Sequence, residues 1–321
     1  MRIRSVATGA ASPCRVQRAV TASTQRGGYK DVRRILIAGC GYVGEATSDL
    51  FHRAGWAVEA WTGSAESAAT LAAKPYPVSA VDISQRIQIG HCAGTFDAVI
   101  HCASSSGGDV EIYRRVYVNG ARNLLEAFPG AKLVFTSSTS VYAQRDGSCV
   151  TEESQTNPER ETGRILLETE KCVLASSGIV ARLAGIYGPG RSALLTKFLN
   201  GTAIIDAESD RFVNQVHRDD IASALFLLIN RESRAAEIYN VVDDQPILQS
   251  QCYHWLAQRL NRPLPSIGTP TQQRKRGDSN KRVSNAKLRR LGWTPQYPTF
   301  GEAMEKSILP SFADVIADAP F

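Results

Sequence analysis

The chain has 321 residues, 43% of them hydrophobic, which is enough for one large α/β domain with a smaller lobe attached. No apolar run reaches the roughly 18 residues that a membrane helix needs, so we expect a soluble, cytoplasmic protein without a membrane partner. The net charge of +6 comes entirely from residues 1–30, which hold six basic and no acidic side chains. The remainder is electrically balanced, so a nucleic-acid partner is not expected.

Residues 1–31 are rich in Arg, Ala, Ser and Thr and show no apolar periodicity. We interpret them as a disordered N-terminal extension and exclude them from fold reasoning. The composition is typical of organelle transit peptides, which would place the protein in a plastid or mitochondrion instead of the cytoplasm. A disordered tail, or a start codon assigned too far upstream, is the other interpretation.

The seven cysteines form no C-x-x-C pair, which favours free thiols in a reducing compartment. Histidine precedes cysteine twice, at His91-Cys92 and His101-Cys102, which suggests a metal cluster at first sight. However, His101 and Cys102 are neighbours on an expected strand, so their side chains point to opposite faces. The spacing fits none of the usual zinc patterns, and no metal site is expected.

Short apolar runs alternate with helical segments from residue 33 onward. The expected strands cover residues 33–39, 56–62, 76–83, 96–103, 131–138 and 178–185. The expected helices cover residues 43–54, 109–127 and 161–171. Apolar strands separated by helices predict a doubly wound parallel α/β sheet that binds ligands at the C-terminal ends of its strands. After about residue 185 the pattern loosens, and a short hairpin is expected around residues 203–216.

The first expected strand runs directly into GCGYVG, which places Gly39, Gly41 and Gly44 at the G-x-G-x-x-G spacing before a helix. The first glycine permits a tight turn, the second lets the backbone approach a diphosphate, and the third lets the helix pack on the strand. The helix N-terminus offers unpaired N–H groups and the positive end of its dipole. The sequence therefore predicts a dinucleotide site that also includes Tyr42 and Val43.

The end of the second strand bears on the choice between NAD and NADP. It reads Thr62, Gly63 and Ser64, without the Asp expected for NAD or the Arg that often marks NADP. Two hydroxyls and a glycine can receive a 2′-phosphate, so NADP is slightly favoured. Asp82, followed by Ile83, closes the third strand and can accept a hydrogen bond from the adenine amino group. A helix cap is its alternative role.

Several motifs carry a family resemblance: GCGYVG, FDAVIHCAS, YVNGARNLLEA and FTSSTSVY, followed by ARLAGIYGPG, EIYNVVDDQP and KRVSNAKLRRLGW. In this order they resemble extended short-chain dehydrogenases/reductases of the NAD-dependent epimerase/dehydratase family. The resemblance implies that Cys102 and Ala103 lie beside the cofactor, that Ser138 hydrogen-bonds the substrate oxygen, and that the protein can form a homodimer. Residues 32–185 would be the NAD(P)-binding Rossmann domain, and residues 186–321 a smaller substrate-binding lobe packed on it.

One departure from the family is severe. The helix after the serine should begin Tyr-x-x-x-Lys, but the two positions are Thr162 and Leu166. In the family the tyrosine is the general acid/base, while the lysine lowers the pKa of that tyrosine and holds the nicotinamide ribose. An aliphatic hydroxyl ionises far above the ~10 of a phenol and cannot replace it. Tyr117 also stands where the family usually has Asn. The chain thus resembles an atypical subgroup.

Other groups near the expected site are weaker candidates. Tyr142 and Tyr187 lie near its mouth, where either could donate the missing proton, although a structural role is the alternative for both. The basic run at residues 274–282 could face a phosphorylated or nucleotide-linked substrate, or be a solvated loop.

These features leave two functions open. The first is an atypical NAD(P)-dependent oxidoreductase or epimerase that acts on a small carbonyl or sugar-like substrate with a rearranged acid/base group. The second is a non-catalytic NAD(P)-binding redox sensor or complex subunit. An ordinary sugar-nucleotide epimerase is disfavoured, because Thr162 and Leu166 replace the reactive pair.

Overall fold

The computed structural model describes residues 32–318, apart from residues 93, 106, 108, 207, 234 and 270–278. The N-terminal extension at residues 1–31 and most of the basic run, residues 274–278, lie outside the described residues. None of the helices within the described ranges is both long and apolar enough to cross a membrane.

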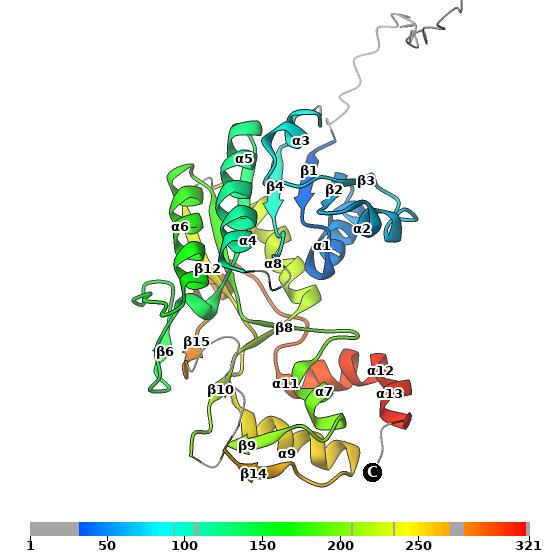
Figure 1. Cartoon of the computed structure of the whole chain (residues 1–321), viewed down its shortest axis with the longest axis vertical. Helices are drawn as coiled ribbons and strands as arrows, with labels where there is room; N and C mark the ends of the chain where they lie inside the picture. Colours follow the sequence, from blue (N-terminus) through cyan, green and yellow to red (C-terminus); the bar gives the residue numbers. More distant parts are fainter. Residues whose placement is uncertain are drawn as a thin grey trace, which may run out of the picture. The chain divides into compact units, whose positions relative to one another are not determined.

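A parallel sheet of seven strands forms the centre of the fold, in the order β12-β7-β5-β4-β1-β2-β3 (Figure 1). The strands are β1 (Arg34–Ala38), β2 (Ala57–Thr62), β3 (Val78–Ala80), β4 (Ala98–His101), β5 (Lys132–Ser138), β7 (Ile179–Leu183) and β12 (Glu237–Val241). The Rossmann-type prediction is confirmed, because all six predicted strands are present in this sheet. The chain order reverses between β1 and β4, which opens a crevice at the C-terminal ends of these two strands.

Helices cover both faces of the sheet, as a doubly wound fold requires (Figure 1). One face carries α1 (Tyr42–Arg53) and α8 (Arg218–Asn230), and the other carries α4 (Val110–Arg114), η1 (Arg115–Asn119), α5 (Gly120–Ala127) and α6 (Glu161–Ala175). The helix expected over residues 109–127 is present, but the π-helical turn η1 interrupts its centre. A π turn inserts about one extra residue into a helix, and apolar periodicity does not reveal it.

A second apolar core lies in the smaller lobe, which contains α7 (Ala193–Leu199), α9 (Gln249–Leu260), α11 (Phe300–Ala303) and η3 (Met304–Ile308). The boundary expected after residue 185 does not hold for the whole chain. Strand β12 pairs in parallel with β7, and α8 packs against α1, so both elements belong to the sheet domain. The chain therefore returns from the lobe to the sheet, so no single boundary in the sequence separates the two parts.

The hairpin expected around residues 203–216 is wrong. Strand β9 (Ile204–Asp206) pairs in parallel with β14 (Ser266–Gly268), and β10 (Phe212–Val213) pairs antiparallel with β13 (Ile247–Leu248). Each short strand thus has a partner far away in the sequence. Local alternation predicts that a segment is extended, but not which strand it pairs with.

A buried ion pair fixes α6 against the sheet. Arg182 on β7 donates to both carboxylate oxygens of Glu170 on α6, at 3.1 and 2.7 Å, and both side chains are less than 5% exposed. The Ser137 hydroxyl donates to the same carboxylate, while Arg182 also donates to the Tyr142 hydroxyl at 2.8 Å. Tyr142 in turn donates to Oδ1 of Asn240 at 2.9 Å. The network joins α6 to β5, β7 and β12.

Removing one partner of this pair should destabilise the fold strongly, because an uncompensated charge would remain buried. We expect Arg182→Met to lower the free energy of unfolding by about 3–5 kcal/mol, measured by urea denaturation. The matched control is Arg164→Met, which breaks the exposed pair with Glu161 on the same helix and should cost less than about 1 kcal/mol. Equal losses in the two variants would contradict a special role for the buried pair.

Candidate functional site

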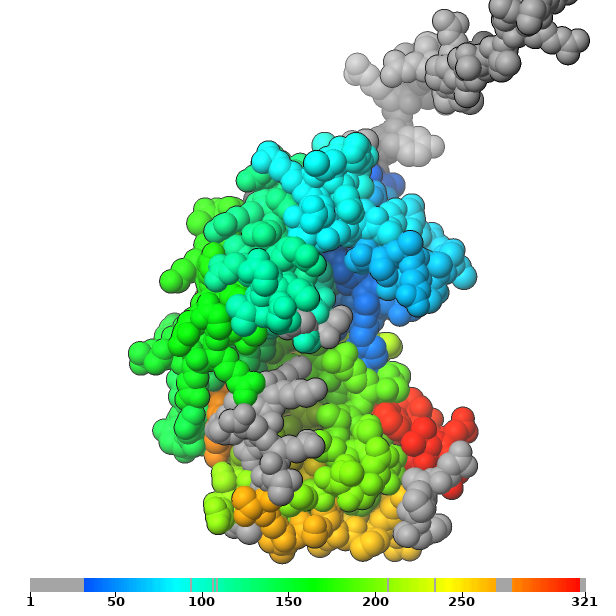
Figure 2. Space-filling view, in the orientation of Figure 1, coloured from blue at the N-terminus to red at the C-terminus, as the bar shows by residue number. Residues whose placement is uncertain are grey.

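A cavity of about 1040 Å³ lies at the C-terminal edge of the sheet, where Figure 2 shows the surface hollowed between the sheet domain and the lobe. Small-molecule sites usually measure about 300–1,000 Å³, so there is room for a dinucleotide-sized ligand. Most of the predicted site residues line this cavity: Gly39, Gly41, Tyr42, Val43, Thr62, Asp82, Ile83, Cys102, Ala103, Ser138 and Thr162. Gly44 and Leu166 are buried and do not line the cavity.

The three glycines of the first turn meet different constraints. Gly39 has a φ of +111°, and an added Cβ would lie 2.2 Å from the backbone nitrogen of Ala103. At Gly44 a Cβ would lie 2.1 Å from the carbonyl oxygen of Gly39. By contrast, a Cβ on Gly41 would meet no atom within 4 Å. The first and third glycines are therefore needed for packing, and open space lies in front of the second.

This open space faces the N-terminus of α1. Gly41 is the N-cap residue and provides no side-chain hydrogen bond, so the first N–H groups of the helix are left for another acceptor. A diphosphate suits such a position in charge and hydrogen bonding. The residues present therefore fit a dinucleotide cofactor.

The C-terminal end of β2 offers fewer free hydroxyl donors for the 2′-phosphate of NADP than expected. The Thr62 hydroxyl donates to the carbonyl oxygen of Ser64 at 3.0 Å, so its proton is already used. Ser64 accepts a hydrogen bond from the Ser67 amide, and Ser67 also lines the cavity. Asp82 lines the cavity and accepts a hydrogen bond from the Ser84 amide at 2.9 Å, within the turn after β3. The alternative role as a helix cap is wrong, because Gln85 is the N-cap residue of the following helix α3 (Arg86–Gly90).

Tyr42 connects the glycine turn to the lobe. Its hydroxyl donates to the carbonyl oxygen of Pro189 at 3.0 Å. The guanidinium groups of Arg191 and Arg218 lie 5.1 and 4.9 Å from the centre of its ring, which is cation–π distance. Burial raises the pKa of the Tyr42 phenol. This contact was not foreseen, because nothing in GCGYVG indicates a partner 147 residues away.

His101 and Cys102 leave β4 in opposite directions, as expected. The Cys102 thiol donates to the carbonyl oxygen of Gly39, and burial raises its pKa far above the usual value, so it is a packing residue. Burial also lowers the pKa of His101 to about 4, although the carbonyl groups of Val116 and Tyr117 act in the opposite direction. Within the described ranges, no group of three or more His, Cys, Asp or Glu side chains is placed to hold a metal.

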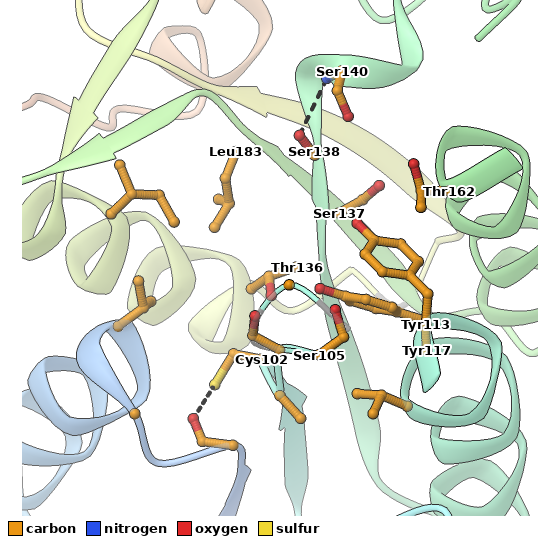
Figure 3. Close-up of a pocket in the computed structure, with 18 of the residues that line it drawn as sticks. Cys102, Ser105, Tyr113, Tyr117, Thr136, Ser137, Ser138, Ser140, Thr162 and Leu183 are labelled. Carbon is orange, nitrogen blue, oxygen red and sulfur yellow. Dashed lines mark hydrogen bonds between the residues drawn. The ribbon is translucent and has the colours of Figure 1, made fainter. Parts of the chain in front are cut away.

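The opposite end of the cavity carries hydroxyl groups (Figure 3). Ser138 accepts a hydrogen bond from the Ser140 amide at 3.2 Å and keeps its own proton for a ligand. Thr162 faces the cavity from the start of α6, whereas Leu166 is 2% exposed and packs in the core. The hydroxyls of Ser138 and Thr162 do not ionise near neutral pH, and Leu166 has no ionisable group. None of the three residues can therefore act as a general acid/base.

The two tyrosines considered as proton donors are not available. The hydroxyl of Tyr142 is engaged by Arg182 and Asn240, and burial raises its pKa. Tyr187 is 1% exposed, and its hydroxyl has no hydrogen-bond partner within the described ranges. Burial raises the pKa of Tyr187 well above that of a free phenol, so both residues are structural.

Several residues that line the cavity were not predicted, including Tyr113, Ser105, Arg145, Arg160 and Arg191. Figure 3 shows the rings of Tyr113 and Tyr117 pointing from their helix into the cavity, near Thr162 and Ser137. The two ring centres are 4.4 Å apart. Tyrosines four residues apart on one helical face were a signal that sequence reasoning could have used.

Comparison with protein families gives a match to the model of the NAD dependent epimerase/dehydratase family over residues 35–241. Protein YeeZ of Escherichia coli K12 is 31% identical over 171 residues, which are 52% of this chain and 59% of that protein. The chain therefore matches little more than half the length of this relative.

Solved structures share the fold. UDP-glucose 4-epimerase of Thermotoga maritima, solved with UDP-glucose, has a TM-score of 0.75 at 19% identity, and the match covers 88% of this chain and 99% of that one. The dTDP-glucose 4,6-dehydratase of Bacillus anthracis, in complex with NAD, has a TM-score of 0.74 at 17% identity, with 88% and 97% covered. At these identities the likeness shows the fold alone.

The glycine geometry predicts that one of two similar substitutions weakens ligand binding and that the other lowers stability. Gly41→Ala should leave the melting temperature nearly unchanged but weaken NAD(P)H binding about tenfold or more, because the new methyl group enters the space for the diphosphate. Gly39→Ala should lower the melting temperature, because its Cβ collides with the backbone of Ala103. Thermal melts and calorimetric titration measure both effects. Unchanged affinity in Gly41→Ala would contradict the diphosphate position.

His101 should make the fold sensitive to acid. Its folded pKa of about 4 is below its usual 6.5, so the unfolded chain binds more protons between these values. The stabilisation is complete above pH ~6.5 and falls by on the order of 3 kcal/mol toward pH ~4. His101→Leu should remove this part of the pH dependence in urea titrations, whereas His91→Leu, at an exposed position, should not. The same acid sensitivity in His101→Leu would refute the assignment.

Proposed function

Because the chain belongs to the NAD-dependent epimerase/dehydratase family, we propose that it is an atypical NAD(P)-dependent oxidoreductase or epimerase acting on a small carbonyl or sugar-like substrate. The observation that carries this proposal is the open space at Gly41, which belongs to a cavity of about 1040 Å³ lined by hydroxyl groups at its other end. The NAD and UDP-glucose named for two solved structures of this fold agree with a dinucleotide and a sugar-like ligand.

The chain's own residues take limited roles in this proposal. The N-terminus of α1 binds the diphosphate, and Gly41 leaves room for it. The Ser138 hydroxyl donates a hydrogen bond to the substrate oxygen and so polarises the carbonyl group. A bound cofactor would supply or accept the hydride, and the accompanying proton would be exchanged with water, because Thr162 and Leu166 provide no acid/base group. Arg145, Arg160 and Arg191 also line the cavity and suit a polar or anionic substituent on the substrate.

The cofactor is proposed to be NADP, with NAD as the close alternative. No carboxylate stands at the end of β2, where one would bind the ribose hydroxyls of NAD. The Ser67 hydroxyl lines the cavity there and can approach a 2′-phosphate, whereas the hydroxyls of Ser64 and Thr62 already donate to Ser67 and to the carbonyl oxygen of Ser64. The preference is therefore expected to be small.

A non-catalytic NAD(P)-binding protein, such as a redox sensor or complex subunit, is the second candidate. Thr162 and Leu166 favour it, because they remove the acid/base group and its cation while the helix remains intact. In this case the dinucleotide would bind without turnover, and its redox state would change the affinity for a partner.

Turnover separates the two candidates. The purified chain is titrated with NADPH and NADH and then assayed with a panel of aldehydes, ketones and UDP-sugars. An enzyme should lose about 100-fold or more in kcat with Ser138→Ala at unchanged cofactor affinity. Thr162→Val is the matched control and should retain activity, because the proposal assigns no proton transfer to α6. Cofactor binding without turnover across the panel would contradict the enzyme and support the sensor.

A further inference from the structure

Tyr117 is 9% exposed and lines the cavity. Its hydroxyl makes no hydrogen bond to the described residues and is not among the fully enclosed atoms without a partner, so it is open to the cavity. Buried tyrosine hydroxyls usually find a partner. Tyr76 and Tyr142 follow this rule here, by donating to Asp49 at 2.6 Å and to Asn240 at 2.9 Å, whereas the enclosed Tyr187 is an exception in the part of the chain that the structure describes. Unlike Tyr187, Tyr117 lines a cavity that can hold a partner. A ligand in the cavity is therefore the natural partner for Tyr117.

The position of Tyr117 indicates which part of a dinucleotide it meets. A dinucleotide in a doubly wound fold spans the crevice where the strand order reverses, with one half on each side. The adenosine half would extend over β2 and β3, toward Thr62 and Asp82. The nicotinamide half would then lie over β4 and β5. The Tyr117 ring packs against His101 of β4 and Phe135 of β5, with centroids 6.3 and 6.1 Å away.

Two hydroxyl groups on this side of the cavity are engaged within the protein. The Thr136 hydroxyl donates to the carbonyl oxygen of His101 at 3.2 Å, and the Ser137 hydroxyl donates to Glu170 at 2.5 Å. Leu166, at the position of the family's ribose-binding lysine, has no polar atom in its side chain. Ribose hydroxyls placed there would lose hydrogen bonds on leaving water unless another group replaced them.

The local structure holds the Tyr117 ring in place. It lies within the π-helical turn η1, and its ring is 4.4 Å from that of Tyr113. Such turns in α-helices occur frequently at functional sites. Because the ring is already packed on its neighbours, a ligand would gain the hydrogen bond with little loss of side-chain entropy.

We propose that the Tyr117 hydroxyl hydrogen-bonds the ribose of the nicotinamide half of the bound dinucleotide. The residue that binds this ribose would then belong to η1, and not to α6 as in the family. The inference rests on the proposed dinucleotide binding and adds a specific residue to it.

The test uses three ligands that extend stepwise across the site: ADP, ADP-ribose and NAD. The same series with a 2′-phosphate is used if the wild type prefers NADP. Calorimetric titration of the full chain is expected to show Tyr117→Phe binding ADP-ribose and NAD about three- to tenfold more weakly, because one hydrogen bond is lost, with ADP affinity unchanged. Tyr113→Phe is the matched control and should bind all three like the wild type. Melting temperatures of the ligand-free variants check that both fold.

Each other outcome is decisive. Equal affinity of the wild type and Tyr117→Phe for ADP-ribose overturns the proposal, and so does an equal loss for ADP, which would indicate a general distortion. The same loss in Tyr113→Phe overturns the assignment to Tyr117. If the wild type itself binds none of the ligands at millimolar concentration, the proposed function fails first, and this inference fails with it.

Discussion

The close approach of three backbone segments is the constraint on which the site depends. Gly39 and Gly44 let the turn after β1, the start of α1 and the end of β4 come closer together than any side chain permits. This packing aims the N-terminus of α1 at the crevice between β1 and β4, and leaves the space at Gly41 free. Strands β2 and β5 flank β1 and β4 in the sheet, so the cavity residues at their C-terminal ends lie on either side of this close approach.

Helix α6 is held in the fold by buried contacts that lie away from the cavity. The ion pair between Glu170 and Arg182 anchors the helix in the core, and it does so one or more turns away from Thr162 and Leu166. The helix is thus held by contacts in the core, to which Leu166 also contributes, while Thr162 lines the cavity.

The sequence predicted what depends on local pattern and missed what depends on distant partners. Continuous apolar runs identify buried parallel strands, and the glycine spacing identifies the turn, because both are short-range properties. The same reasoning failed for β12, β9 and β10, whose pairing partners lie far along the chain. It also offered Tyr142 as a proton donor, because the network that engages its hydroxyl involves Arg182 and Asn240, 40 and 98 residues away.

The contact of Tyr42 with the lobe has a mechanical consequence. Tyr42 is the first residue of α1, its hydroxyl donates to the carbonyl oxygen of Pro189, and the guanidinium group of Arg191 lies at cation–π distance from its ring. A hinge motion that widened the cavity would have to break the hydrogen bond from Tyr42 to Pro189 or move the first turn of α1 with the lobe. The first helical turn of α1 and the segment that leads into the lobe are therefore mechanically coupled through this one side chain.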